Sequence, residues 1–161
     1  MTKQDTRFHL DETITYVEAL ADVPESIWRK PMKPGKWSMA ETIGHFTPWD
    51  HFVLMNRIPY LLSGENLPKG PDVDELNTSS ALQSRNKPVE QLISEFATTR
   101  NKLIESIRQI DDSLWEKPIS IGEKKIILSV YFKGLDDHDV HHLKQIDQFL
   151  KHSGIEKPFN F

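Results

Sequence analysis

Apolar residues recur at helical spacing in four long stretches of the chain, and segments that contain most of its prolines and glycines separate them. Side chains three and four positions apart share one face of a helix, so each stretch can bury one face against the others. This pattern predicts an all-α fold, and the helix lengths favour a four-helix bundle. The predicted helices cover residues 6–21, 38–62, 88–110 and 128–152.

The connections between these helices are unequal, and one of them is long. Residues 64–87 are polar and broken by prolines and glycines, which predicts a crossover between the second and third helices, with a short helical turn near residues 74–82. Ser38 and Glu41 form a capping-box pattern that starts the second helix. Residues 119–127 carry a weak strand or hairpin signal.

Length and composition narrow the possible classes of protein. The chain has 161 residues, the common size of one domain, so residues 1–161 are expected to form a single domain. The formal charge of −4, without a basic block, argues against a nucleic-acid-binding protein. No apolar run approaches the roughly 20 residues that a membrane span needs, and the polar start has no signal-peptide pattern. We therefore expect a cytoplasmic protein without nucleic-acid or membrane partners.

The chain contains no cysteine, so a metal ion would have to be held by histidine and carboxylate side chains. The strongest candidates are His138 and His142 in the last predicted helix. They occupy consecutive positions of an otherwise apolar stripe and lie four residues, about one turn, apart. Two imidazoles in an apolar interior each need a partner, and a shared metal ion would satisfy both. The expected inward stripe consists of Tyr131, Leu135, His138, His142, Ile146 and Phe149.

A third ligand is expected from the second helix, which contains two histidines. His45 and His51 are six residues apart, so they cannot both face one cavity. His45 is preferred because it lies in the early turns, close to the capped start of the helix. Three neutral imidazoles would leave an open position on Zn²⁺ or Ni²⁺, which is typical of a catalytic site. The candidate acceptors for the second ring nitrogens are Asp50, Asp139 and Gln145.

Two segments of the sequence resemble the signatures of a known family. Residues 36–45, KWSMAETIGH, are similar to the W-S-x-x-E-x-x-x-H signature of the DinB/YfiT-like proteins. Residues 138–146, HDVHHLKQI, resemble the closing H-x-x-H-H-x-x-Q-I motif of that family. The resemblance covers essentially the whole chain, including the long middle connection. It implies a four-helix bundle, a homodimer, and a divalent nickel or zinc ion bound by His45, His138 and His142.

The resemblance also implies what such a site does. Members include metal-dependent transferases of low-molecular-weight thiols such as bacillithiol, mycothiol or glutathione, and a mycothiol-dependent maleylpyruvate isomerase; others are named metal-dependent hydrolases or damage-inducible proteins. We therefore expect an enzyme that transfers a thiol of the bacillithiol class to a small-molecule electrophile. The alternatives are a hydrolase of an amide or ester, and a non-catalytic stress-response protein that binds metal. The sequence assigns no catalytic residue and no contact with the thiol cosubstrate.

The remaining conspicuous residues are expected to be structural. Trp37, Trp49 and Trp115 are predicted to pack in the core rather than to line a substrate pocket. The acidic residues among residues 136–139 are predicted to form a solvated face of the last helix. His141 is predicted to flank the metal site without binding the ion.

Overall fold

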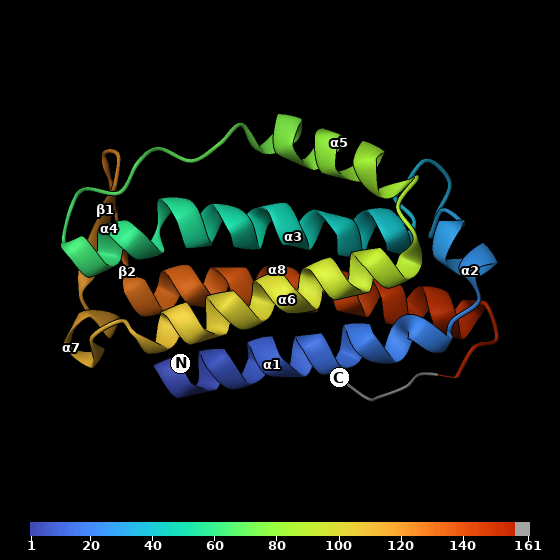
Figure 1. Ribbon diagram of the computed structural model, residues 1–161, viewed down its shortest axis with the longest axis horizontal. Helices are drawn as coiled ribbons and strands as arrows, with labels where there is room; N and C mark the ends of the chain where they lie inside the picture. The colour runs from blue at the N-terminus through green and yellow to red at the C-terminus, as the bar shows by residue number, and fades with distance from the viewer. Residues whose placement is uncertain (157–161) are drawn as a thin grey trace.

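The computed structural model describes residues 1–156, and four long helices form its main body (Figure 1). In Figure 1 they lie side by side along the long axis of the molecule, with α6 between α1 and α3 in this view. The predicted all-α four-helix bundle, with its long crossover between the second and third long helices, is confirmed. No helix within residues 1–156 is apolar over a length sufficient to cross a bilayer. The four helices are α1 (Lys3–Ala19), α3 (Met39–Asn56), α6 (Val89–Arg108) and α8 (Leu128–His152).

Shorter elements connect the long helices. The crossover carries α5, which packs against α3 (Figure 1) and is longer than the helical turn predicted there. The weak strand signal corresponds to an antiparallel hairpin of β1 and β2, which turns at Gly122 with a positive φ of 58°. The connecting elements are η1 (Leu20–Asp22), α2 (Glu25–Arg29), α4 (Ile58–Ser63), α5 (Val73–Ser84), α7 (Asp112–Trp115), β1 (Pro118–Ile121) and β2 (Lys124–Ile127).

Local hydrogen bonds explain where the first two long helices begin. The predicted capping box at the start of α3 is present: the amide of Ser38 donates to Glu41 Oε2 at 2.8 Å, and the amide of Glu41 donates to Ser38 Oγ at 3.3 Å. An equivalent box joins Thr2 and Asp5, which is why α1 begins at Lys3, earlier than predicted.

The prediction of one continuous helix over residues 38–62 was wrong. The chain breaks at Arg57, whose φ of −128° and ψ of −60° are not helical, and α4 starts afresh at Ile58. Pro59 explains the break, because proline has no amide hydrogen and its ring clashes with the carbonyl four residues earlier in a continuing helix. The new helix accepts Pro59 within its first turn, where the missing donor is not needed.

The predicted core stripe of α8 was also displaced. His138 and His142 lie at the edge of the buried face and are only half-buried. Two acidic residues that were predicted to be solvated, Asp136 and Asp139, are 8% and 1% exposed. Asp136 and Asp139 interrupt the apolar pattern of the face that is actually buried. The adjacent stripe through His138 and His142 was therefore predicted as the core face. The most buried side chains along α8 include Phe132, Asp136, Asp139, Leu143, Ile146 and Leu150.

The core consists of two apolar clusters, one toward each end of the bundle. One cluster contains Phe46 of α3 and Phe96 of α6, and the other contains Val53 and Leu103 of the same two helices. Buried charged residues lie between these positions on α3, α6 and α8. A polar layer therefore separates the two halves of the core at mid-bundle.

Two glycines inside long helices offer a matched test of the α3–α5 contact. A Cβ placed on Gly44 would lie 1.8 Å from Oγ of Ser84, whereas a Cβ on Gly134 meets nothing within 4 Å. We expect Gly134→Ala to raise the free energy of unfolding by up to about 1 kcal/mol. Gly44→Ala should lower it by about 1–3 kcal/mol, because α5 must shift. Urea denaturation followed by circular dichroism measures both; equal stability of the two variants would contradict the packing of α5 on α3.

Candidate metal centre

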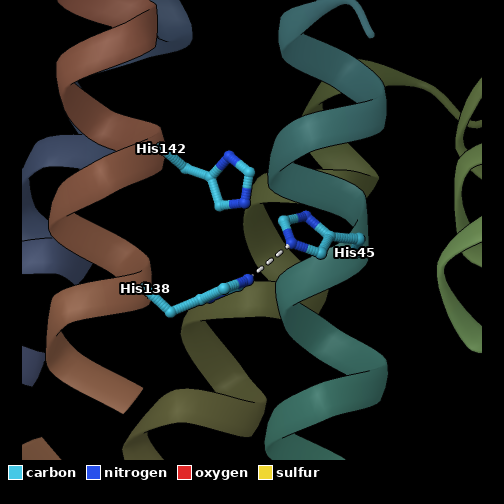
Figure 2. A group of neighbouring side chains, drawn as sticks. All are labelled: His45, His138 and His142. Atoms are coloured by element: carbon cyan, nitrogen blue, oxygen red, sulfur yellow. Dashed lines mark hydrogen bonds between the residues drawn. The ribbon is translucent and has the colours of Figure 1, made fainter. Parts of the chain in front are cut away.

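Three histidines from two helices converge on one point at the edge of the polar layer. His45 lies in the second turn of α3, and His138 and His142 lie one turn apart on α8, with their rings directed toward His45 (Figure 2). One nitrogen from each ring can be chosen so that the three atoms all lie within 4.8 Å of one another. His45 is 1% exposed, whereas His138 and His142 are half-buried. The structure thus brings together the three residues that the sequence singled out.

The distances between the rings suit a shared ion. Nε2 of His45 lies 3.2 Å from Nε2 of His138, and this contact is drawn as the dashed line in Figure 2. Two nitrogens bound to a tetrahedral ion at about 2.05 Å lie about 3.3 Å apart, which is close to this separation. The ring centroids of His45 and His142 are 4.6 Å apart, and those of His138 and His142 are 4.7 Å apart.

The outer ring nitrogens bond to oxygen atoms, which fixes the orientation of the rings. Nδ1 of His45 bonds to the backbone carbonyl of Thr42, and Nδ1 of His142 bonds to Oε1 of Gln145 at 3.0 Å. An oxygen that only accepts places the proton on Nδ1, so Nε2 keeps its lone pair and can bind a metal. Gln145 was one of the predicted acceptors. The carbonyl of Thr42 was not, because sequence alone does not show which backbone oxygens face a ring.

The electrostatics of the site also favour neutral imidazoles. Burial, reinforced by the nearby ring of His142, lowers the pKa of His45 to about 3. Burial, reinforced by His138, lowers the pKa of His142 to about 4. Histidine binds metal in its neutral form, so these residues are ready to act as ligands at neutral pH. Three imidazole nitrogen donors fit a borderline divalent ion such as Zn²⁺ or Ni²⁺.

A cavity of about 870 Å³ opens beside His142. Trp37 lines it, and the Trp37 ring lies 4.9 Å from the ring of His45, between centroids. The prediction that Trp37 is a core residue was therefore wrong: its half-buried ring lines the cavity and contacts the ring of His45. Trp115, by contrast, is buried and stacks on Phe132, as expected for core packing.

The remaining histidines lie away from the convergence point. His51 is exposed on α3, which supports the choice of His45 over His51. His141 is exposed, and its ring contacts the side-chain amide of Gln145 at 3.1 Å. This position agrees with the prediction that His141 flanks the site.

Comparison with known proteins identifies the family. The model of the DinB superfamily matches residues 9–146. The chain belongs to the DinB superfamily. The resemblance seen in its two motifs is thereby confirmed. A search of curated proteins finds no match.

Solved structures show the same fold at low sequence identity. This DinB-superfamily chain is similar to YfiT from Bacillus subtilis, a probable metal-dependent hydrolase with an unusual four-helix bundle topology; the TM-score is 0.80 at 16% identity, covering 96% of this chain and 89% of YfiT. It is also similar to the mycothiol-dependent maleylpyruvate isomerase, with a TM-score of 0.66 at 13% identity. That alignment covers 89% of this chain but only 60% of the isomerase. A mutant of the same isomerase aligns with a TM-score of 0.68.

A buried charge network lies behind the histidines of this DinB-superfamily chain. Arg100 of α6 is 0% exposed; its Nε donates to Asp50 of α3 at 2.6 Å, and its Nη1 donates to Asp139 of α8. The other carboxylate oxygen of Asp139 lies 3.6 Å from Nδ1 of His138. Asp139 therefore lies between the ring of His138 and the buried Arg100. The prediction that it is solvated was wrong; as a predicted acceptor it lies close to the His138 ring, at a distance longer than a hydrogen bond.

The network holds a net negative charge next to the histidines. Burial opposes the charge of Arg100, but the carboxylates of Asp139 and Asp50 outweigh it and raise the pKa of the guanidinium. Burial raises the pKa of Asp50 to about 6, although Arg100 opposes this shift. Burial acts in the same direction on Asp139, but there Arg100 and His138 prevail and lower the pKa. Two carboxylates and one guanidinium therefore lie beside the three imidazole rings, which suits a divalent cation.

Arg100 was not predicted as a site residue, although the sequence contains a signal for it. It lies four residues after Phe96 and three before Leu103, in the middle of the apolar stripe of α6. An arginine at a core position of an amphipathic helix requires buried acidic partners. Asp50 and Asp139 could have been proposed as those partners from the same reasoning.

Removal of Arg100 should strongly destabilise the protein. Arg100→Met leaves two buried carboxylates without their cation, and we expect the free energy of unfolding to fall by about 3–5 kcal/mol. Arg108→Met is the matched control, because Arg108 lies on the same helix with a side chain that is 60% exposed. The control should change stability by no more than about 0.5 kcal/mol. Urea denaturation of both variants makes the comparison; similar effects would contradict the proposed link between the helices.

Proposed function

We propose that this protein is a divalent-metal-dependent enzyme that transfers a low-molecular-weight thiol to an electrophile. His45, His138 and His142 would hold the ion. The observation that carries the proposal is the convergence of three imidazoles beside a cavity large enough for a small molecule. Three protein ligands would leave a coordination position open for a reactant.

The chain's own residues define what such a site can do. The ion would supply Lewis acidity that favours ionisation of a thiol at neutral pH. The chain has no cysteine, so the sulfur must arrive with a cosubstrate. Trp37 and Phe149 offer apolar surface in the cavity, which would exclude water from the reactants.

The comparisons support this proposal without deciding the substrate. One structural neighbour is mycothiol-dependent, which supports a thiol as cosubstrate. Another is named a probable metal-dependent hydrolase, so hydrolysis is the main alternative. A non-catalytic protein that binds metal is the third possibility, and the homodimer implied by the resemblance stays a prediction.

The lining of the cavity shows what thiol transfer and hydrolysis would each require of this chain. Hydrolysis of an amide or ester needs a proton acceptor near the activated water. No described residue that lines the cavity is an aspartate or glutamate. His152 lines the cavity too, and its Nδ1 is hydrogen-bonded to the backbone carbonyl of Gln148 at 2.6 Å. This bond places the proton on Nδ1 and leaves Nε2 as an acceptor, so His152 is the candidate base of the hydrolase alternative. A thiol with a lowered pKa needs no such base.

Metal analysis tests the ligand set. After purification without chelators and reloading with Zn²⁺ or Ni²⁺, we expect about one ion per chain by elemental analysis. Separate alanine variants of His45, His138 and His142 should weaken binding by at least about 100-fold, more than the 10- to 100-fold loss typical of an outer hydrogen-bond partner such as Gln145. His51→Ala is the matched control and should bind normally. Unchanged binding in all three ligand variants would overturn the site.

Activity measurements test the reaction class. The metal-loaded protein is incubated with bacillithiol, mycothiol or glutathione and a chromogenic electrophile, and thiol adducts are followed by absorbance. We expect turnover with at least one thiol and a fall of at least about 100-fold in His142→Ala, beyond the loss caused by an outer-partner mutation, but not in His51→Ala. Turnover of amide or ester substrates without any thiol would favour the hydrolase. If the protein is inactive on all substrates and unfolds when the metal is removed, the non-catalytic alternative would be favoured.

A further inference from the structure

A tight turn presents two lysines at the cavity. The amide of Lys36 donates to the carbonyl of Lys33 at 3.0 Å, which closes a four-residue turn. Pro34 occupies its second position and Gly35 its third, with φ of +71°. Proline and a glycine with positive φ at these two positions are the signature of a type II turn. The turn therefore holds the lysines at its two ends close together.

The turn is fastened to the helix that carries His45. Pro31 and Ser38 form an antiparallel bridge, and the amide of Met32 donates to the carbonyl of Trp37 at 3.0 Å. Ser38 is also the capping residue of α3. The segment from Pro31 to Ser38, which we call the lysine hairpin, is thus joined to α3 through consecutive hydrogen-bonded residues. The lysines at its turn therefore keep a fixed place relative to His45 of α3.

The local charge at the cavity is positive although the chain as a whole carries −4. Lys33 and Lys36 both line the cavity, and none of the described residues in its lining is acidic. Within residues 1–156 neither lysine forms an ion pair with a carboxylate. Lysine ammonium groups without acidic partners in a concave site attract anions.

The other walls of the cavity describe the rest of the occupant. Trp37 and Phe149 supply apolar surface, and Gln145 and Gln148 supply side-chain amides. His142 lies in the same lining, so a molecule there reaches from the lysine turn to the metal centre. Such a surface suits a molecule with an apolar body and one charged end.

We propose that the cavity binds a small organic anion, whose carboxylate or phosphate lies against Lys33 and Lys36 while its apolar part packs on Trp37. This inference rests on the proposed function in taking the anion to be one of the two reactants. The binding itself requires no reaction. It can therefore be measured when turnover is absent.

Paired probes that differ in charge test the proposal on the metal-loaded protein. Phenylacetate, phenyl phosphate and the neutral phenylacetamide are titrated separately into nitrogen-labelled protein and followed by two-dimensional NMR. We expect both anions to bind more tightly than the amide and to shift the signals of the lysine hairpin, residues 31–38. In Lys33→Gln/Lys36→Gln the affinity for the favoured anion should fall by about 5-fold, the size expected for two partly exposed ion pairs. The phosphate and carboxylate arms show which head group is preferred.

The control variant, Lys124→Gln/Lys125→Gln, removes the same charge at the other end of the bundle, on β2 (Figure 1). It should leave the affinity for all three probes unchanged. Direct coordination of an anion to the ion occurs equally in both lysine variants and cancels in the comparison. Three outcomes would each overturn the anion site. They are failure of all probes to bind at millimolar concentration, equal affinity for the anions and the amide, and an equal loss of affinity in the two lysine variants. Charge-dependent binding without thiol transfer would overturn the proposed reaction alone.

Discussion

The ion pairs of Arg100 fix the arrangement of three helices around the metal centre. A guanidinium with no exposed surface is tolerated only where acidic partners meet it. Asp50 of α3 and Asp139 of α8 can both reach it in only one register of the bundle. Asp139 directly follows His138, and Asp50 lies five residues after His45, so the same register brings the candidate ligands face to face. The geometry of the three-histidine cluster therefore depends on Arg100, which is not one of the candidate ligands.

The position of this network within the core is also significant. It separates two apolar clusters, each of which packs side chains from several helices. Apolar packing is non-directional and tolerates small shifts along a helix axis. A charged layer does not tolerate them, because each carboxylate must stay within hydrogen-bond reach of one guanidinium. The metal centre lies where the axial register is most strictly defined.

Much of the fold was predictable because periodicity and capping are local signals. The pair His138 and His142 stood out by its spacing, and Ser38 marked the start of α3. The break at Arg57 was missed although its cause, Pro59, is local. The failures at the candidate site instead involve residues whose surroundings come from other segments of the chain. Asp139 was taken as solvated because its cation lies on a different helix, at Arg100. The position of Trp37 in the lining of the cavity depends on the path of the lysine hairpin, which helical periodicity does not describe.

The distribution of the three candidate ligands over two helices has a further consequence. His138 and His142 belong to one rigid helix, so the distance between them is set by the rise of α8. The distances from His45 to both are set instead by the separation of α3 and α8. A change in packing between these two helices would lengthen two sides of the ligand triangle and leave the third unaltered. If the three histidines bind an ion, helix packing would thus set the ionic radius that fits, without replacement of any of them.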